Sequence, residues 1–139
     1  MKRGIALVCI PVVVIAAYLA FSFTNYVDYL EKTIHETDRW AVITDSNGDI
    51  IAVETTSDTI WSQLVDLHQN QTRMWIGGIV QEYNNTWRFR FQPDTLTIAQ
   101  ITIEAAQSNI KGISEDLDYW MHTWAKETYT LSKVTEIHE

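Results

Sequence analysis

The sequence has few of the residue types that build catalytic or metal centres. Its single cysteine is Cys9, so the rest of the chain can form neither a disulfide nor a thiolate site. The four histidines (His35, His68, His122 and His138) are scattered, and none stands at zinc-ligand spacing with another histidine or a cysteine. Glycine-rich phosphate loops, nucleophile elbows and dinucleotide fingerprints are also missing. We therefore predict no catalytic residue, no metal site and no cofactor, and we do not expect an enzyme.

Basic residues are scarce as well. The chain carries 10 Lys and Arg against 18 Asp and Glu, which gives a formal net charge of −8. An acidic surface repels nucleic acid and anionic lipid headgroups. We therefore expect no nucleic-acid partner. The charge is compatible with a basic partner, and it also serves solubility alone.

One stretch has no charge at all. Residues 5–23 read IALVCIPVVVIAAYLAFSF, and as a helix they would be about 28 Å long, close to the hydrocarbon thickness of a bilayer. Lys2 and Arg3 precede this stretch, and basic flanks stay on the cytoplasmic side. We therefore predict a cytoplasmic N-terminus at 1–4, a transmembrane signal-anchor at 5–23 and an extracytoplasmic C-terminal domain. A cleaved secretory signal is the alternative, since Ala20 and Ser22 could precede a cleavage site.

Aromatic residues gather at the outer end of this stretch, as in the interfacial belt of membrane proteins. The candidates for the membrane interface are Phe21, Phe23, Tyr26 and Tyr29. Val27, Leu30 and Ile34 recur at helical spacing, which predicts an amphipathic helical stalk over 24–38. Its apolar stripe could pack on the chain's own domain, on a second copy or on another membrane protein. Sequons at Asn70 and Asn84 are compatible with an extracytoplasmic side.

The remaining residues, 39–139, alternate between strand and helix patterns. Two apolar runs, 40–44 and 50–54, flank Asn47-Gly48, which predicts a β-hairpin. Ser57 or Asp58 can cap the helix that follows. Apolar alternation predicts three further strands, at 74–81, 87–92 and 99–105. Gly77-Gly78 lies inside the first of these, where glycine indicates a bulge or a close backbone approach.

The C-terminal part of the chain predicts one more helix and one more strand. Ser114 is expected to cap a helix over 115–127, with an apolar stripe made of Leu117, Trp120, Met121 and Trp124. A strand at 131–137 would close the chain. This order predicts an α+β domain with a mainly antiparallel sheet and two packed helices, preceded by a single transmembrane helix.

Three charged residues are the candidates for a ligand site or an ion pair. In Trp87-Arg88-Phe89-Arg90-Phe91 the alternation places the aromatics on one face of a strand and the two arginines on the other. Glu104 stands among apolar neighbours in a predicted strand. A solvated strand face would explain Glu104, and otherwise it would pair with Arg88 or Arg90 on an adjacent strand.

From Met74 onward the chain resembles a known family. The segments WIGGIVQEYNNTWRFRFQPDTLTIAQITIEAAQ and SEDLDYWM are similar to the domain named for the N-terminal part of a slime-mould calmodulin-binding protein. The resemblance covers residues 50–137. It implies no established catalytic residues, and the chain has no basic amphipathic helix of the calmodulin-target type.

Two departures from the family pattern concern cysteines. Ala106 and Thr128 stand where the family often has cysteines, and both cysteines are missing together. The resemblance thus implies that the two cysteines pair in relatives. Our hypothesis is that Ala106 and Thr128 lie close enough for a disulfide, which requires a Cα separation below ~7 Å.

These observations favour attachment over catalysis. The first interpretation is a membrane-anchored, extracytoplasmic interaction module, an accessory subunit of a larger membrane protein complex or a protein that self-associates through the stalk. The second is a small-ligand or cation-binding sensor, with its site near Glu104, Arg88 and Arg90. The third is a hydrolase that uses scattered carboxylates.

Overall fold

The computed structural model describes residues 37–100, 106–123 and 127–139. Seven strands carry most of this structure: β1 (Trp40–Asp45), β2 (Ile50–Glu54), β3 (Met74–Glu82), β4 (Phe89–Phe91), β5 (Thr97–Ala99), β6 (Ala106–Gln107) and β7 (Glu127–His138). The helices of the described residues are α2 (Asp58–Asn70), α3 (Ile110–Glu115) and α4 (Leu117–Met121), with a short 3-10 turn, η1 (Pro93–Thr95).

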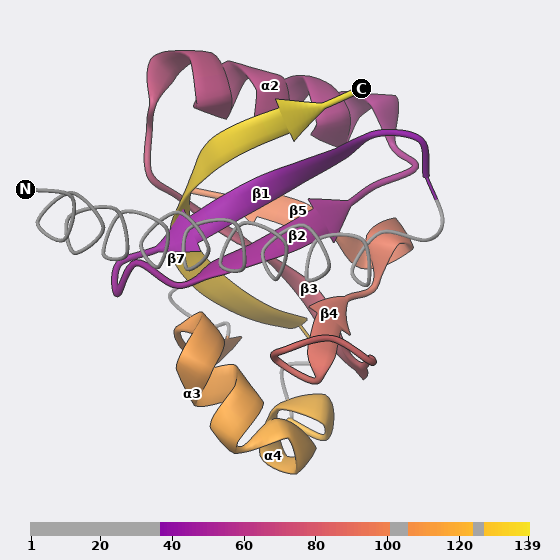
Figure 1. The fold of residues 1–139 in the computed structure, drawn as a ribbon, viewed down its shortest axis with the longest axis vertical. Helices are drawn as coiled ribbons and strands as arrows, with labels where there is room; N and C mark the ends of the chain where they lie inside the picture. The colour runs from indigo at the N-terminus through magenta and orange to yellow at the C-terminus, as the bar shows by residue number, and fades with distance from the viewer. Residues whose placement is uncertain (1–36, 101–105, 124–126) are drawn as a thin grey trace, which may run out of the picture.

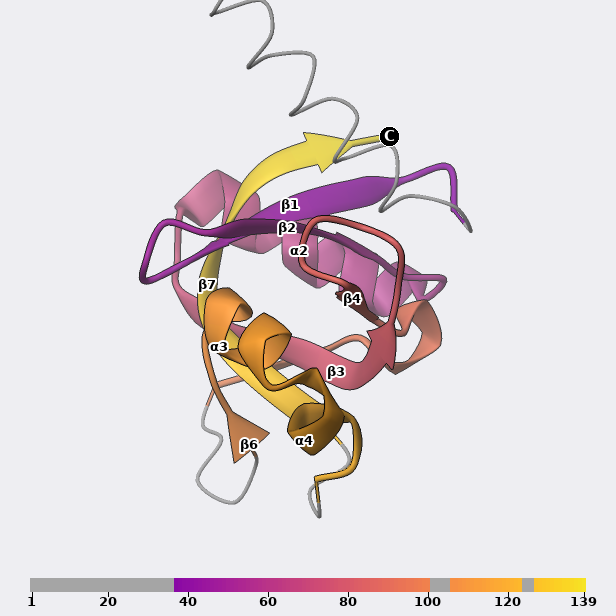
Figure 2. The same ribbon diagram turned by 60° about the horizontal axis from the view of Figure 1, so that its bottom comes forward.

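The strands form one sheet that curls into a nearly closed barrel (Figure 2). Its order is β2-β1-β7-β3-β4, with every one of these pairs antiparallel. The long strand β7 pairs with β1 along its C-terminal half and with β3 along its N-terminal half, so the sheet turns along this strand. At the two ends of the order, β2 and β4 come into contact. Two short strands lie off this path: β5 pairs with β3, and β6 runs parallel to β7.

The inward side chains of the strands and one face of α2 make the core. Ile43, Ile76, Phe89 and Val134 are fully buried in it, together with Leu64 of α2. Helix α2 lies at one end of the barrel, and α3 and α4 lie at the other end (Figure 1). The two ends therefore carry different helices, and only the α2 end is closed by a helix of several turns.

Local chemistry explains the hairpin and α2. Gly48 adopts a φ of 85° in the turn between β1 and β2, a conformation that glycine adopts without strain. Ser57 caps α2, since its Oγ accepts a hydrogen bond from the Ile60 N–H at 3.2 Å. Gln71, with a φ of 52°, ends the helix. The predicted hairpin and the predicted cap at Ser57 are confirmed.

The glycine pair in β3 marks a close approach of backbones, as predicted. A Cβ on Gly77 would lie 1.9 Å from the backbone oxygen of Thr128 on β7. A Cβ on Gly78 would lie 2.8 Å from Oγ1 of Thr95, which follows β4. Side chains at these positions would force β3 away from its neighbours, so glycine permits the tight curl of the sheet.

The predicted fold class, an α+β domain with two packed helices after a transmembrane helix, is wrong. The described residues form mostly antiparallel sheet in a nearly closed barrel with three short helices. The predicted helix over 115–127 is replaced by α3 and α4, because Asp116 (φ −135°, ψ 53°) leaves the helical conformation between them. Asn109, not Ser114, caps α3, and β7 already begins at Glu127.

The predicted single-pass membrane topology is not supported either. Within 37–100, 106–123 and 127–139, no helix is long and apolar enough to cross a membrane. The longest, α2, has 13 residues, about 20 Å at 1.5 Å per residue, and it is amphipathic. We therefore withdraw the signal-anchor, the transmembrane helix and the extracytoplasmic location. The segment 5–23, with its interface residues, lies outside the described residues, and so does the stalk stripe of Val27, Leu30 and Ile34.

Candidate functional site

The two arginines predicted as site residues make separate contacts. Arg88, in the turn before β4, has a φ of 63°, and its Nη2 donates to the backbone oxygen of Ser114 at 2.9 Å. Arg90, in β4, is only 8% exposed; its Nε donates to Oε1 of Gln81 at 3.0 Å, and its guanidinium lies 4.5 Å from the ring centre of Tyr83. Both arginines thus hold parts of the fold together.

The aromatic residues of the same segment bear out only part of the predicted alternation. Phe89 and Phe91 are buried and meet edge to face at 5.7 Å. Trp87 lies before β4, and its Nε1 donates to the backbone oxygen of Ile50 at 2.7 Å. The third candidate, Glu104, lies outside the described residues, so its pairing with Arg88 or Arg90 stays a prediction.

The α3–α4 end of the barrel is the part of the structure that is built most openly. Asn109 caps α3 by accepting the Gly112 N–H at 2.7 Å, and Ile110 and Ile113 anchor that helix in the core. In α4, by contrast, no residue is buried. Leu117 and Trp120 pack on the core only in part.

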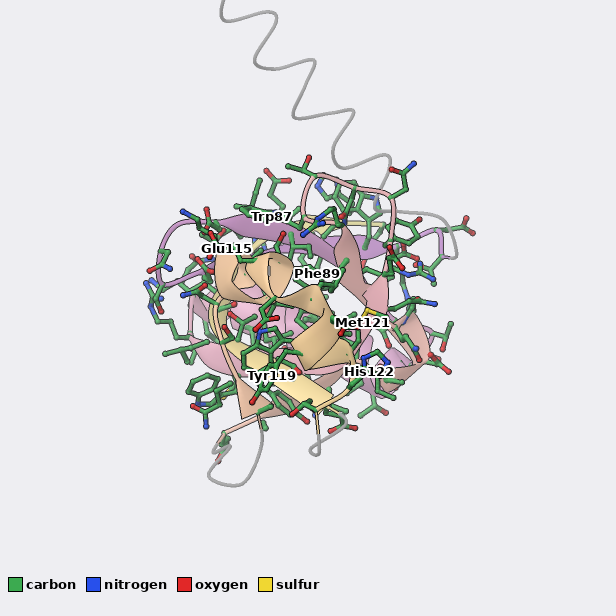
Figure 3. The ribbon with its side chains drawn as sticks, turned by 90° about the horizontal axis from the view of Figure 1, so that it is seen from below. Trp87, Phe89, Glu115, Tyr119, Met121 and His122 are labelled. Atoms are coloured by element: carbon green, nitrogen blue, oxygen red, sulfur yellow. The ribbon has the colours of Figure 1, made fainter. Side chains whose placement is uncertain are left out.

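Two large apolar side chains of α4 point into solvent. Tyr119 is 55% exposed and Met121 is 36% exposed, and in the described chain they are the exposed large hydrophobics. Figure 3 looks onto this end and shows both side chains on α4, with His122 beside Met121. The sequence placed Met121 in a buried stripe, which is wrong, because α4 ends at Met121 after five residues. Trp124, the last residue of that stripe, lies outside the described residues.

Carboxylates surround these apolar side chains. A groove of about 370 Å³ runs beside α4 and is lined by Met121, Leu117 and the four acids Glu82, Glu115, Asp116 and Asp118. Arg88 is the one cation in the lining, and it already donates to Ser114. We call the set of Glu82, Glu115, Asp116, Asp118, Tyr119 and Met121 the α4 surface. It combines negative charge with exposed apolar area.

The chemistry elsewhere is that of a packed domain. Within the described ranges, no group of three His, Cys, Asp or Glu side chains could hold a metal ion. Burial raises the pKa of Tyr129 above 10.0, and its hydroxyl donates to Oε2 of Glu127 at 2.8 Å. Thr97 lies 2.8 Å from the same hydroxyl. This cluster ties β5 to β7 and offers no nucleophile beside a base.

The pairing of β6 with β7 brings together the two positions where relatives often carry cysteine. Ala106 is the direct register partner of Thr128 in this parallel pair. Neighbouring strands lie about 4.8 Å apart, which is well inside the range of Cα separations that a disulfide bridges. The predicted proximity of the two positions is confirmed.

The comparisons with known proteins agree with the resemblance seen in the sequence. The model of the domain family named for the N-terminal part of the slime-mould calmodulin-binding protein matches residues 37–137. The chain belongs to this family, and the match begins earlier than the predicted residue 50. No curated protein and no solved structure matches the chain.

Proposed function

We propose that this domain is a non-catalytic interaction module that binds a basic segment of a partner protein through the α4 surface. The observation that carries the proposal is the exposure of Tyr119 and Met121 between four carboxylates. In this proposal the domain acts as an accessory subunit, and its partner supplies both lysine or arginine and apolar side chains.

The apolar part of the surface favours a protein partner. Aromatic residues and methionine are enriched at the centres of protein interfaces, because they bury large areas or adapt to irregular contacts. Tyr119 also meets Trp120 edge to face at 4.9 Å, so its ring is held against a partly buried neighbour. A ring that is already oriented loses little conformational freedom on binding.

The charged part of the surface favours a basic partner. The carboxylates of Glu82, Asp116 and Asp118 lie around the groove, and the chain as a whole carries a net charge of −8. Complementary charge steers association and rejects partners of like sign. An acidic or strongly phosphorylated segment would therefore be excluded.

Fluorescence anisotropy with two labelled synthetic peptides tests this function. One peptide alternates lysine with leucine, and the matched control carries glutamate in place of every lysine. We expect the basic peptide to bind and the acidic one not to bind. Raising the salt concentration should weaken binding, because mobile ions screen exposed charges. Binding of both peptides, or binding that salt leaves unchanged, would contradict the proposal.

Matched variants locate the binding site. Tyr119→Ala should weaken binding about tenfold, which corresponds to roughly 1.4 kcal/mol. Asp118→Asn should weaken it less and lower its salt dependence. Asp66→Asn removes the same charge from exposed α2 at the other end of the barrel and serves as the control. Equal effects of Asp118→Asn and Asp66→Asn would show that only the net charge matters and would refute the α4 surface.

A further inference from the structure

A second cavity opens where the sheet is interrupted. Strand β1 pairs with β7 as far as Asp45 and Ser132, and β6 pairs with β7 at Thr128 and Tyr129. The two residues between these stretches, 130 and 131, have no partner strand on that side within the described ranges. A cavity of about 270 Å³ lies at this gap.

Uncharged hydrogen-bonding groups line most of the cavity. They come from the β1–β2 turn, from β6 and the cap of α3, and from β7. These groups belong to Ser46, Asn47, Gln107, Ser108, Asn109 and Thr130. Since three segments far apart in the sequence supply them, the arrangement exists only in the folded domain.

The single carboxylate in the lining is already used by the fold. Asp45 is only 3% exposed. Its Oδ1 accepts the N–H groups of Asn47 and Asp49 at 3.0 Å each, and its Oδ2 accepts the N–H of Ile110 at 2.9 Å. Asp45 therefore joins the hairpin turn to α3, and its charge is neutralised by backbone donors rather than offered to a ligand.

Two of the polar side chains keep donors for a ligand. Asn109 uses its Oδ1 to cap α3, so its amide nitrogen, on the other branch, can donate to a bound molecule. The Ser46 oxygen accepts from Nη1 of Arg73 at 3.2 Å, which leaves its O–H as a donor. The structure thus holds both groups in place before a ligand arrives.

The remaining wall is apolar. Trp75 and Leu131 are register partners on β3 and β7, and both are half-buried in the lining. Trp75 lies on the opposite face of β3 from the buried Ile76, since successive side chains of a strand alternate. An indole beside neutral donors and acceptors suits a flat ligand with one apolar face and a rim of hydroxyl groups.

We infer that this cavity binds an uncharged sugar ring, with its C–H face on Trp75 and its hydroxyl groups on the side chains of the turn and of the α3 cap. A charged ligand would find no opposite charge, because Asp45 is satisfied internally. A wholly apolar ligand would leave amide and hydroxyl groups without partners, which costs free energy. This site is separate from the α4 surface and does not depend on the function proposed for it.

An NMR titration of the ¹⁵N-labelled full chain tests the inference. The probes are the methyl pyranosides of glucose, galactose and mannose, together with free glucose. We expect at least one to give saturable shifts at the Trp75 indole N–H and at the side-chain amides of Asn47 and Asn109. The methyl pyranoside of glucuronic acid, which differs from that of glucose by one charge, should bind more weakly. Binding of the methyl pyranosides would indicate the end of a glycan, and binding of free glucose alone would indicate a free sugar.

Two variants and two controls make the test decisive. Trp75→Leu and Asn47→Ala should each weaken the sugar binding about tenfold, whereas Gln69→Ala, an exposed amide removed from α2, should leave it unchanged. Glycerol replaces the sugar in the second control and should give no saturable shift. If a variant fails to fold, the shift map of the unmodified chain decides. The absence of saturable shifts with every sugar, or shifts outside the cavity, would overturn the inference.

Discussion

The two ends of the barrel carry helices that differ in their relation to the core. Helix α2 has 13 residues and buries Trp61, Leu64 and Leu67. Helix α4 has five residues, buries none and leaves Tyr119 and Met121 in solvent. Figure 1 shows the two helices at opposite ends of the sheet. One end is thus closed by the chain itself, and the other keeps apolar surface available.

This difference separates stability from binding. A helix that covers the interior of the sheet contributes its apolar area to folding, about 25 cal/mol for each Å² removed from water. A helix whose apolar side chains remain exposed contributes little to folding and can bury the same area in a complex. We therefore expect substitutions at the α2 end to change the free energy of unfolding and substitutions at α4 to change binding.

The largest effect should come from truncating the buried face of α2. Leu64→Ala leaves a cavity in the core and should lower the free energy of unfolding by about 4 kcal/mol. Met121→Ala in α4 should change it by no more than about 0.5 kcal/mol. Urea unfolding followed by tryptophan fluorescence measures both. Similar losses in the two variants would break the contrast between the ends.

A disulfide should strengthen the attachment of the open end. Strand β6 leads directly into α3, and Ala106 and Thr128 are register partners. In a Cys9→Ser background, Ala106→Cys with Thr128→Cys should form a disulfide under oxidising conditions and raise stability by about 2 kcal/mol. Thr128→Cys also removes a buried hydroxyl that has no hydrogen-bond partner within the described ranges. The control is the same protein after reduction, and failure to oxidise would contradict the pairing.

Tyr129 should make stability depend on alkaline pH. Burial raises its pKa in the folded state above the usual 10.0, so the unfolded chain loses this proton first. The stability contributed by the neutral hydroxyl is present below pH 10 and is lost as the pH rises through the folded-state pKa. Tyr129→Phe should cost about 1 kcal/mol at pH 7 through its lost hydrogen bonds and should reduce the loss above pH 10. An unchanged alkaline slope would refute this assignment.

The smallest effect should come from the charges of α4. Asp118 lies 3.3 Å from Nδ1 of His122, and both side chains are exposed. Exposed ion pairs contribute little to stability. Asp118→Asn should therefore leave the urea midpoint unchanged while it weakens binding of the basic peptide. A clear loss of stability would place Asp118 among the structural residues instead.

The hairpin and α2 were predictable because their signals are local. Asn47-Gly48 between apolar runs and Ser57 before an amphipathic stretch identify a turn and a cap without reference to the rest of the chain. The helix predicted over 115–127 failed because its apolar residues continue past a break at Asp116 that the pattern does not show. Its true cap, Asn109, precedes a short apolar run that fits a strand or a helix equally well.

The candidate site was less predictable than the fold. Arg88 and Arg90 stood out in the sequence as charges between aromatic residues, but the structure uses them in contacts within the domain. Tyr119 and Met121 attracted no attention, because an apolar pattern predicts burial and cannot show which stretch lacks a covering partner. The cluster of acids from 115 to 118 was the one signal in the sequence that an exposed helix begins there.

The sequence by itself determined the family, the hairpin, the capped helix α2 and the tight approach at Gly77-Gly78. These follow from turn chemistry, hydrophobic period and residue size, which act over a few neighbouring residues. Only the tertiary structure decided that the sheet closes into a barrel, that a gap separates β1 from β6, and that α4 stays open to solvent. Each of these depends on which distant strands pair along β7, and a residue's exposure is decided by what the rest of the chain places upon it.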